Sequence, residues 1–259
     1  MESVGTFLIA DPVSWVLALL GVLIVGVSKG GFGGSLGVVG VPFLAVAIPI
    51  NQAAAIMLIC LIIMDVTGIC GWKGSWCRLQ LARLLPAAGL GVCLGAISFH
   101  ALSESALKVM IGLIGLVFAV QWWIKHLNIV EESEQVIPSN WHTRFWGMVA
   151  GFTSFSVHAG GPPLQVALLP QRLEPAVYAA TTVVFFAFVN IMKVLPYYWL
   201  DQFSAKVLWT SLVFVPLCPL AVSLGIFMNK RVSSLWFYRV CYFGLVISSG
   251  RLLIIGTTT

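Results

Sequence analysis

Residues 28–42, SKGGFGGSLGVVGVP, place a lysine and several glycines inside a stretch of sequence that is otherwise apolar enough for a membrane. Inside a lipid bilayer every backbone N–H and C=O group needs a hydrogen-bond partner. A break in a membrane helix is therefore tolerated only where protein or a water-filled cavity surrounds it. We interpret Ser28–Pro42 as part of a binding site rather than as a linker.

The composition places this chain among integral membrane proteins. Of its 259 residues, 59% are hydrophobic and 9% are charged, and the mean hydropathy is +1.00. The long apolar runs predict helical spans, because barrel strands alternate apolar and polar residues. The net charge of +5 is dispersed over short loops, which excludes a nucleic-acid patch. The first residues lack a basic region typical of a secretory signal, so we expect them to be retained.

Apolar runs near 20 residues in length predict the membrane spans. The first, second and sixth runs are too short to cross and lie beside glycine-rich breaks, so we expect each break to join two half-length helices. The six cysteines form no CxxC pair and are expected to be small buried hydrophobes. The runs are Val13–Val27, Leu36–Ile50, Ala53–Trp72, Leu81–His100, Ala106–Ile124, Phe145–Val157, Leu164–Leu169, Val177–Leu200, Val207–Met228 and Leu235–Ile255.

A polar stretch, residues 125–144, divides the chain into two similar halves. An offset of 125 places Gly26 on Gly151 and Asp65 on Asn190, and an offset of 130 later places Gly95 on Gly225. We therefore expect a first repeat over residues 1–128, a connecting loop over 129–143 and a second repeat over 144–259. Two-fold repeats are common in secondary transporters. Ser28–Pro42 then corresponds to a second break, Thr153–Pro163, with the sequence TSFSVHAGGPP.

The loop charges favour a hairpin at each break over a kink in one long helix. With hairpins, each half has three full spans, the two halves are inverted relative to each other, and both termini lie outside the cytoplasm. A kinked helix would give a weaker charge asymmetry. In the hairpin arrangement only Lys108, Lys206 and Arg251 face the opposite side from Lys73, Arg78, Arg83, Lys125, Arg144, Arg172, Lys230 and Arg231.

Lys29 opens the first break, where an unpaired ammonium in hydrocarbon is costly. It can anchor an anion, assisted by backbone N–H groups of the adjoining glycines. The alternative is that Lys29 extends to the cytoplasmic interface. The candidate site residues of the first break are Lys29, Gly30, Gly31, Gly33, Gly34 and Ser35.

The second break offers hydroxyl, imidazole and amide donors together with bare glycine backbone. Groups of this kind can surround an oxyanion without neutralising it fully. A histidine beside Gly-Gly-Pro-Pro at a helix break is more suggestive of a site than a histidine on an apolar face. The candidates are Ser156, His158, Gly160, Gly161 and Gln165, with Ser154 standing at the position equivalent to Lys29.

Two predicted spans, one in each half, carry polar residues that could meet. Asn190 and Lys193 are three residues apart and share one helix face, and Asp65 is the repeat equivalent of Asn190. An ion pair between Asp65 and Lys193 would relieve both charges. That pair could be structural, or one of its members could exchange a proton during transport, and Asp65 is our candidate.

An enzymatic alternative rests on residues 33–37, which match the G-x-S-x-G pattern. With His158, Ser35 could form an intramembrane serine hydrolase. No strand precedes the pattern, and a glycine-rich run produces it easily. We find no H-E-x-x-H, Walker A or metal-binding cluster in the sequence, so we expect no enzyme activity, metal or cofactor.

The sequence resembles the TauE/SafE family of sulfite exporters, also described as the toluene-sulfonate uptake permease group. The resemblance rests on GVSKGGFGGSLGVVGVPFLA in the first half and GFTSFSVHAGGPPLQVALLP in the second, and covers about Ser14 to Leu253. It implies an ATP-independent carrier for sulfite, sulfonates or related anions, driven by protons. It also implies substrate-binding roles for Gly30–Gly40 and His158–Pro163.

We therefore predict a multi-pass transporter of the inner membrane that moves a sulfur-containing oxyanion and a proton. The substrate would lie between the two breaks, with Lys193 supplying a second positive charge because Ser154 replaces lysine in the second half. A passive anion channel is the main alternative. Substrate identity, direction of transport and assembly into a homo-oligomer are left open by the sequence.

Overall fold

A computed structural model describes residues 8–9, 11–37, 40–98, 104–127 and 139–258. These residues form helices joined by short turns, with no strand in the described ranges, which confirms the all-helical prediction. Among the residues described, five helices are long and apolar enough to cross a membrane, and one bent pair could form a sixth span. Most of the predicted connecting loop and His100 lie outside the described residues.

In the first half, three long helices follow the glycine-rich hairpin. Helix α1 (Pro12–Gly31) is capped at its N-terminus by Asp11, whose carboxylate accepts a hydrogen bond from the backbone N–H of Ser14. A short α2 (Gly40–Leu44) follows the break. The long helices are α3 (Ile50–Trp72), α4 (Arg78–Ile97) and α5 (Glu104–Leu127).

The second half also begins with two helices on either side of a glycine-rich break. Helices α6 (Asn140–Val157) and α7 (Gly161–Leu168) flank the second break, and a 3-10 turn, η2 (Leu169–Gln171), follows. The remaining helices are α8 (Pro175–Trp199), α9 (Ala205–Phe214), α10 (Leu217–Asn229) and α11 (Ser234–Thr258).

Several predicted spans differ from the observed helices. The run Phe145–Val157 belongs to a longer helix, α6, and within Leu36–Ile50 the helix α2 covers only Gly40–Leu44. Val13–Val27 is too short to cross, yet α1 continues through Lys29 to Gly31, giving 20 residues. The predicted span Val207–Met228 has the right extent, but α9 and α10 meet at a 42° bend beside Pro216. A proline lacks a backbone N–H and its ring clashes with the preceding turn, which accounts for the bend.

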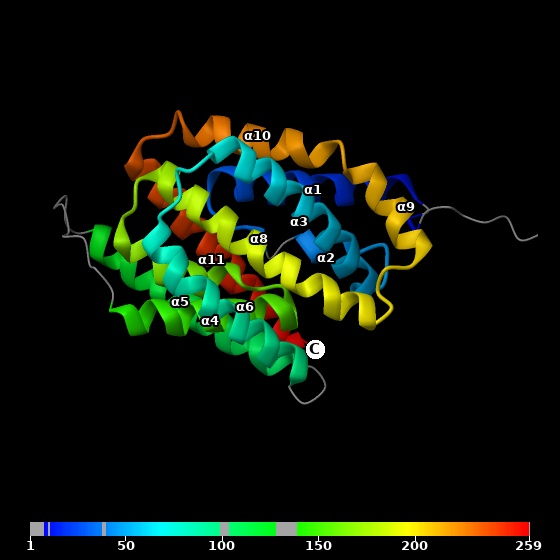
Figure 1. The fold of residues 1–259 in the computed structure, drawn as a ribbon, viewed down its shortest axis with the longest axis horizontal. Helices are drawn as coiled ribbons and strands as arrows, with labels where there is room; N and C mark the ends of the chain where they lie inside the picture. Colours follow the sequence, from blue (N-terminus) through cyan, green and yellow to red (C-terminus); the bar gives the residue numbers. More distant parts are fainter. Residues whose placement is uncertain (1–7, 10, 38–39, 99–103, 128–138, 259) are drawn as a thin grey trace, which may run out of the picture.

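Each glycine-rich hairpin packs against a long helix from the other half of the chain. Helix α1 packs on α10, and α6 packs on α4, while α3 and α8 contact each other. In Figure 1, α1 runs from right to left and α3 starts again on the right, so the first break reverses the chain. Helix α6 starts on the left, and α8 starts there too.

Close crossings between these helices require glycine. A Cβ on Gly31 would lie 2.3 Å from the carbonyl oxygen of Gly225, and one on Gly151 would lie 2.2 Å from that of Ala88. Backbone oxygens in packed helices cannot move aside easily. Buried residues form two main apolar clusters, one centred on α1, α3 and α10 and the other on α4, α6, α8 and α11.

The cysteines divide into three groups, of which Cys77, half-buried, forms one by itself. Cys60, Cys218 and Cys241 are buried, as expected for small hydrophobes. Cys70 and Cys93 are exposed on α3 and α4, so the expectation of burial is wrong for these two.

Candidate functional site

A cavity of about 50 Å³ lies where the two breaks meet α3 and α8. A site of this size holds roughly four water-sized atoms. Its walls combine two lysines, a histidine and an asparagine with glycine backbone and apolar side chains. The lining residues are Val25, Lys29, Gly34, Gly37, Leu61, Ser154, His158, Gly160, Gly161, Phe186, Asn190 and Lys193.

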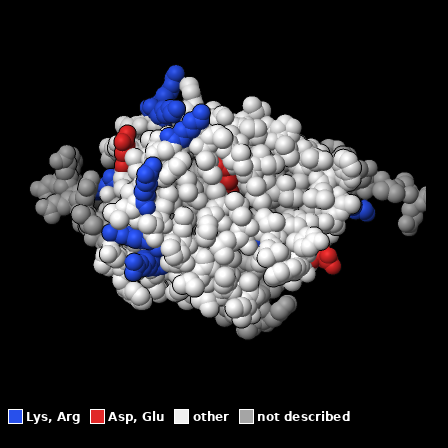
Figure 2. Space-filling view, in the orientation of Figure 1, with Lys and Arg blue, Asp and Glu red and all other residues white. Residues whose placement is uncertain are grey.

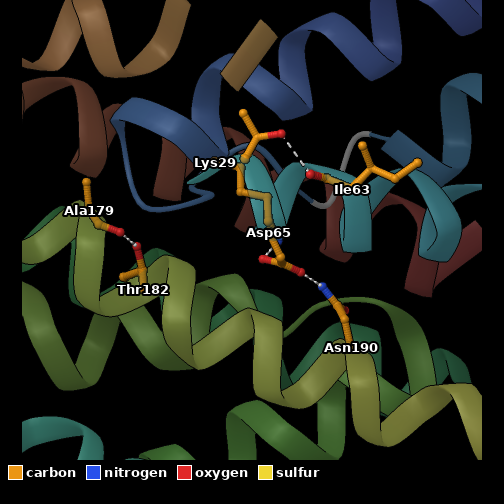
Figure 3. Close-up of polar contacts among 7 residues, drawn as sticks. Lys29, Ile63, Asp65, Ala179, Thr182 and Asn190 are labelled. Carbon is orange, nitrogen blue, oxygen red and sulfur yellow. Dashed lines mark hydrogen bonds and ion pairs between the residues drawn. The ribbon is translucent and has the colours of Figure 1, made fainter. Parts of the chain in front are cut away.

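A buried ion pair closes one side of the cavity. The ammonium Nζ of Lys29 lies 2.8 Å from Oδ1 of Asp65, and both side chains are 4% exposed. The amide of Asn190 donates to Oδ2 of Asp65 at 2.8 Å. Figure 3 shows Asp65 between Lys29 and Asn190, so that one carboxylate links α1, α3 and α8.

These contacts correct two expectations. Lys29 is buried beside its counter-ion and does not extend to the membrane interface. Asp65 pairs with Lys29 rather than with Lys193. The sequence could not decide between the two lysines, because Lys29 comes near Asp65 only when the first hairpin folds against α3.

Lys193 is therefore a cavity-lining charge for which the described residues provide no counter-ion. Its side chain is 1% exposed, and it forms no ion pair or hydrogen bond with any residue that the structure describes. The ammonium of Lys29, by contrast, has Asp65 and also lies 5.2 Å from the centre of the Phe186 ring. An unpaired buried ammonium is costly unless an anion accompanies it.

The second break contributes backbone and imidazole groups. His158 ends α6 in the left-handed conformation, with φ of 53°, and its Nε2 forms a hydrogen bond with the hydroxyl of Tyr197 on α8. Helix α7 starts at Gly161, and Pro162 and Pro163 have no N–H group. The backbone N–H groups at this end of α7 that can serve the cavity therefore belong to glycines, because both Gly160 and Gly161 line it.

Three glycines predicted to bind substrate lie outside the cavity wall. Gly30 and Gly31 are the last residues of α1, and their missing Cβ atoms permit contact with the backbone of Val222 and Gly225 on α10. Gly33, with φ of 63°, packs against the ring of Tyr178. Instead of lining the cavity, these glycines permit close helix packing and the turn of the first break.

Three predicted polar residues are also not among the residues that line the cavity. The hydroxyl of Ser35 donates to the carbonyl of Phe32, and that of Ser156 donates to the carbonyl of Phe152. Gln165 is 1% exposed, and neither atom of its amide has a hydrogen-bond partner among the described residues. Gln165 lies behind Gly161, since a Cβ built on Gly161 would be 4.0 Å from Nε2 of Gln165.

The candidate residues that line the cavity are Lys29, Gly34, His158, Gly160, Gly161, Asn190 and Lys193, with Asp65 behind them. Sequence reasoning missed three apolar members, Val25, Leu61 and Phe186. Leu61 and Phe186 are counterparts at the offset of 125 that relates Asp65 to Asn190, but apolar residues in an apolar span carry no signal that would mark them as cavity lining.

Catalytic chemistry has little support in this geometry. Ser35 is 2% exposed and forms no hydrogen bond with a histidine in the described ranges. Among the described residues, no group of three His, Cys, Asp or Glu side chains could hold a metal ion.

Comparison with known proteins gives one family. The sequence model described as Sulfite exporter TauE/SafE matches residues 17–252, which is nearly the whole chain. No curated protein and no solved structure matches.

Proposed function

The chain belongs to the sulfite exporter TauE/SafE family, and we propose that it is a secondary transporter that binds a small sulfur oxyanion in the cavity between its two breaks. Members of this family are membrane transporters, in agreement with the apolar helices of the fold. The substrate, the site and the coupling ion are our proposals.

The observation that carries this proposal is the unpaired ammonium of Lys193. A charge buried in a protein is normally matched by an opposite charge or by several hydrogen bonds. Lys193 lines a cavity in which no described carboxylate is left to pair with it, because Asp65 is engaged by Lys29 and Asn190. An oxyanion in the cavity would meet that need and could also accept from Asn190, Ser154 and the glycine N–H groups.

An inverted repeat, which we propose for this chain, would give the site a mechanism. Helix bounds agree at the two offsets: α3 shifted by 125 becomes 175–197, beside the observed Pro175–Trp199, and α5 shifted by 130 becomes 234–257, beside Ser234–Thr258. Two pairs of cavity residues are counterparts at the offset of 125: Lys29 with Ser154, and Leu61 with Phe186. A site built from equivalent positions of two repeats favours alternating access, in which one repeat rocks against the other.

Asp65 remains our candidate for proton coupling. A proton on its carboxylate would weaken its hold on Lys29 and release that ammonium to the substrate. The hydrogen bond between Asp65 and Asn190 joins equivalent positions of the two halves. Rocking of one half against the other would therefore change the length of this bond.

The distribution of charge supports an orientation in the inner membrane. Most of the visible Lys and Arg side chains gather on the left in Figure 2. The ends of α3 and α10 and the starts of α4 and α8 lie on that side in Figure 1, while α1 starts and α11 ends on the right. By the positive-inside rule the left side is cytoplasmic, which would place both termini outside the cytoplasm.

Flux of radiolabelled sulfite into proteoliposomes tests the proposal. Lys193→Met should reduce flux by about 30-fold or more, because removing one partner of a buried charge pair costs about 2–5 kcal/mol. Lys206→Met, which removes an exposed lysine of α9, is the matched control and should leave flux unchanged. Unchanged flux in Lys193→Met would refute the site, and single-channel conductance without proton movement would identify a passive channel instead.

A further inference from the structure

We propose that Asp65 sets the valence of the transported anion, so that the cavity accepts a compact oxyanion with one negative charge and disfavours one with two. This inference rests on the proposed function, because it assumes that the cavity binds the substrate. It goes beyond it by assigning a charge to the substrate and a specificity-determining role to one carboxylate.

The charges around the cavity lead to this conclusion. Lys29 comes from α1 and Lys193 from α8, and Asp65 from α3 is the one acidic residue in contact with a lining side chain among the described residues. His158, from the second break, is bonded to the neutral hydroxyl of Tyr197. Two ammonium groups and one carboxylate leave a net charge of one positive unit, and a single negative charge balances it.

Two contacts fix the position of the Asp65 carboxylate beside the cavity. Its Oδ1 faces Lys29 and its Oδ2 accepts from Asn190, each at 2.8 Å, so the carboxylate is fixed by both neighbours. It cannot turn towards Lys193 without losing one of these contacts. A divalent anion beside Lys193 would bring a second negative charge close to this fixed carboxylate, in a buried site where water screens the repulsion weakly.

The two halves differ in charge at this position. The equivalent of Asp65 in the second half is Asn190, which has the same shape and no charge. The substitution Asp65→Asn would therefore give both halves the same neutral amide and raise the net charge of the cavity to two positive units. The same cavity should then favour a divalent anion.

Sulfate and methanesulfonate are suitable probes because both are tetrahedral at sulfur and have five heavy atoms. They differ in charge, and neither changes its protonation state near neutral pH. Binding of each to the purified full-length protein would be measured by isothermal titration calorimetry at constant ionic strength. For the natural sequence we expect methanesulfonate to bind at least about 10-fold more tightly than sulfate.

The variants test whether preference follows charge. In Asp65→Asn the ratio of sulfate to methanesulfonate affinity should rise by about 10- to 100-fold. In the double variant Lys29→Met with Asp65→Asn, the net charge returns to one positive unit, so the preference for methanesulfonate should return. Glu174→Gln removes an exposed carboxylate before α8 and should leave the ratio unchanged.

If Asp65→Asn does not fold, Asn190→Asp provides the opposite change. It adds a second carboxylate, and both anions should bind much more weakly, sulfate most of all. An affinity ratio that is unchanged in the Asp65 and Asn190 variants would overturn the inference while leaving the anion site intact. Sulfate binding as tightly as methanesulfonate in the natural sequence would also overturn it, whereas loss of both anions there would refute the proposed function itself.

Discussion

The two glycine-rich breaks have the same backbone design and different charges. In each, a helix is followed by residues with positive φ, Gly33 and Gly34 in the first and His158 in the second, and a short helix comes next. In each, the entering helix crosses a helix from the other half at close range. Lys29, however, has Ser154 as its counterpart. Packing is repeated while charge is not, which indicates that the fold and the proposed binding of an anion depend on different residues.

The aromatic residues that hold the breaks extend this comparison. Trp72 near the end of α3 donates its indole N–H to the carbonyl of Gly30 at 3.0 Å. Tyr197, its equivalent at an offset of 125, bonds His158. Each break is thus tied to the central long helix of its own half, by an indole in one case and by a phenol in the other.

Removing the charge of Lys29, which distinguishes the first break from the second, should have the largest effect on stability. Lys29→Met leaves Asp65 buried without its counter-ion, which we expect to lower the free energy of unfolding by about 3–5 kcal/mol. Unfolding in SDS, followed by circular dichroism, measures this. Ser154→Ala, at the equivalent position, should change stability by less than about 1 kcal/mol.

The double variant Lys29→Met with Asp65→Asn removes both charges of the pair and should recover most of the stability lost in Lys29→Met. A double variant no more stable than the single one would show that the ion pair is not the cause. Comparable losses in Lys29→Met and Ser154→Ala would remove the proposed difference between the breaks.

Overpacking the two helix crossings should have the next largest effect, and an equal one in the two halves. Gly31→Ala would press a methyl group against the carbonyl of Gly225, and Gly151→Ala would do the same at Ala88. Each should destabilise by about 1–3 kcal/mol. Gly250→Ala on α11, which meets nothing within 4 Å, is the control and should be neutral or slightly stabilising.

Thermal unfolding measured by size-exclusion chromatography after heating would compare these three variants. A loss at one crossing and none at the other would show that the halves do not pack equivalently.

A smaller effect is expected at the turn of the first break. Gly34 has φ of 70°, where an L-residue is disfavoured, so Gly34→Ala should destabilise by about 1–2 kcal/mol. Its Cβ would lie 3.5 Å from the Phe186 ring, which leaves room for it, so the backbone rather than crowding sets this value. Gly37→Ala lines the same cavity without steric conflict and provides the comparison in thermal unfolding. Equal melting temperatures for the two variants would contradict the prediction.

The smallest effects should come from the aromatic ties. Tyr197→Phe and Trp72→Phe each remove one hydrogen bond, which typically contributes about 0.5–1.5 kcal/mol. Tyr197→Phe also frees the imidazole of His158 at the cavity, so it should change anion affinity, whereas Trp72→Phe should not. Calorimetric titration with methanesulfonate separates the two, and an unchanged affinity in Tyr197→Phe would argue against a role for His158.

Much of the fold and part of the site could be predicted from residue types and spacing. The apolar runs gave the helices, and the offsets of 125 and 130 paired positions that the structure places in contact, such as Asp65 with Asn190. The roles of the glycines could not be separated in this way. Glycine permits both a close helix crossing and a bare backbone at a cavity, so Gly31 and Gly161 look alike in sequence although only Gly161 lines the cavity.

The amino-acid sequence by itself determined that this is a helical membrane protein with two glycine-rich breaks and with ionisable residues in or beside its apolar runs, because apolarity, glycine content and charge are local properties. The tertiary structure alone decided which of these charges meet. The sequence offers two possible ion-pair partners for Asp65, Lys29 and Lys193. Folding of the first break onto α3 and α8 pairs Asp65 with Lys29. Lys193 is left facing the cavity without a partner, since an ion pair depends on distances of a few ångströms that only packing fixes.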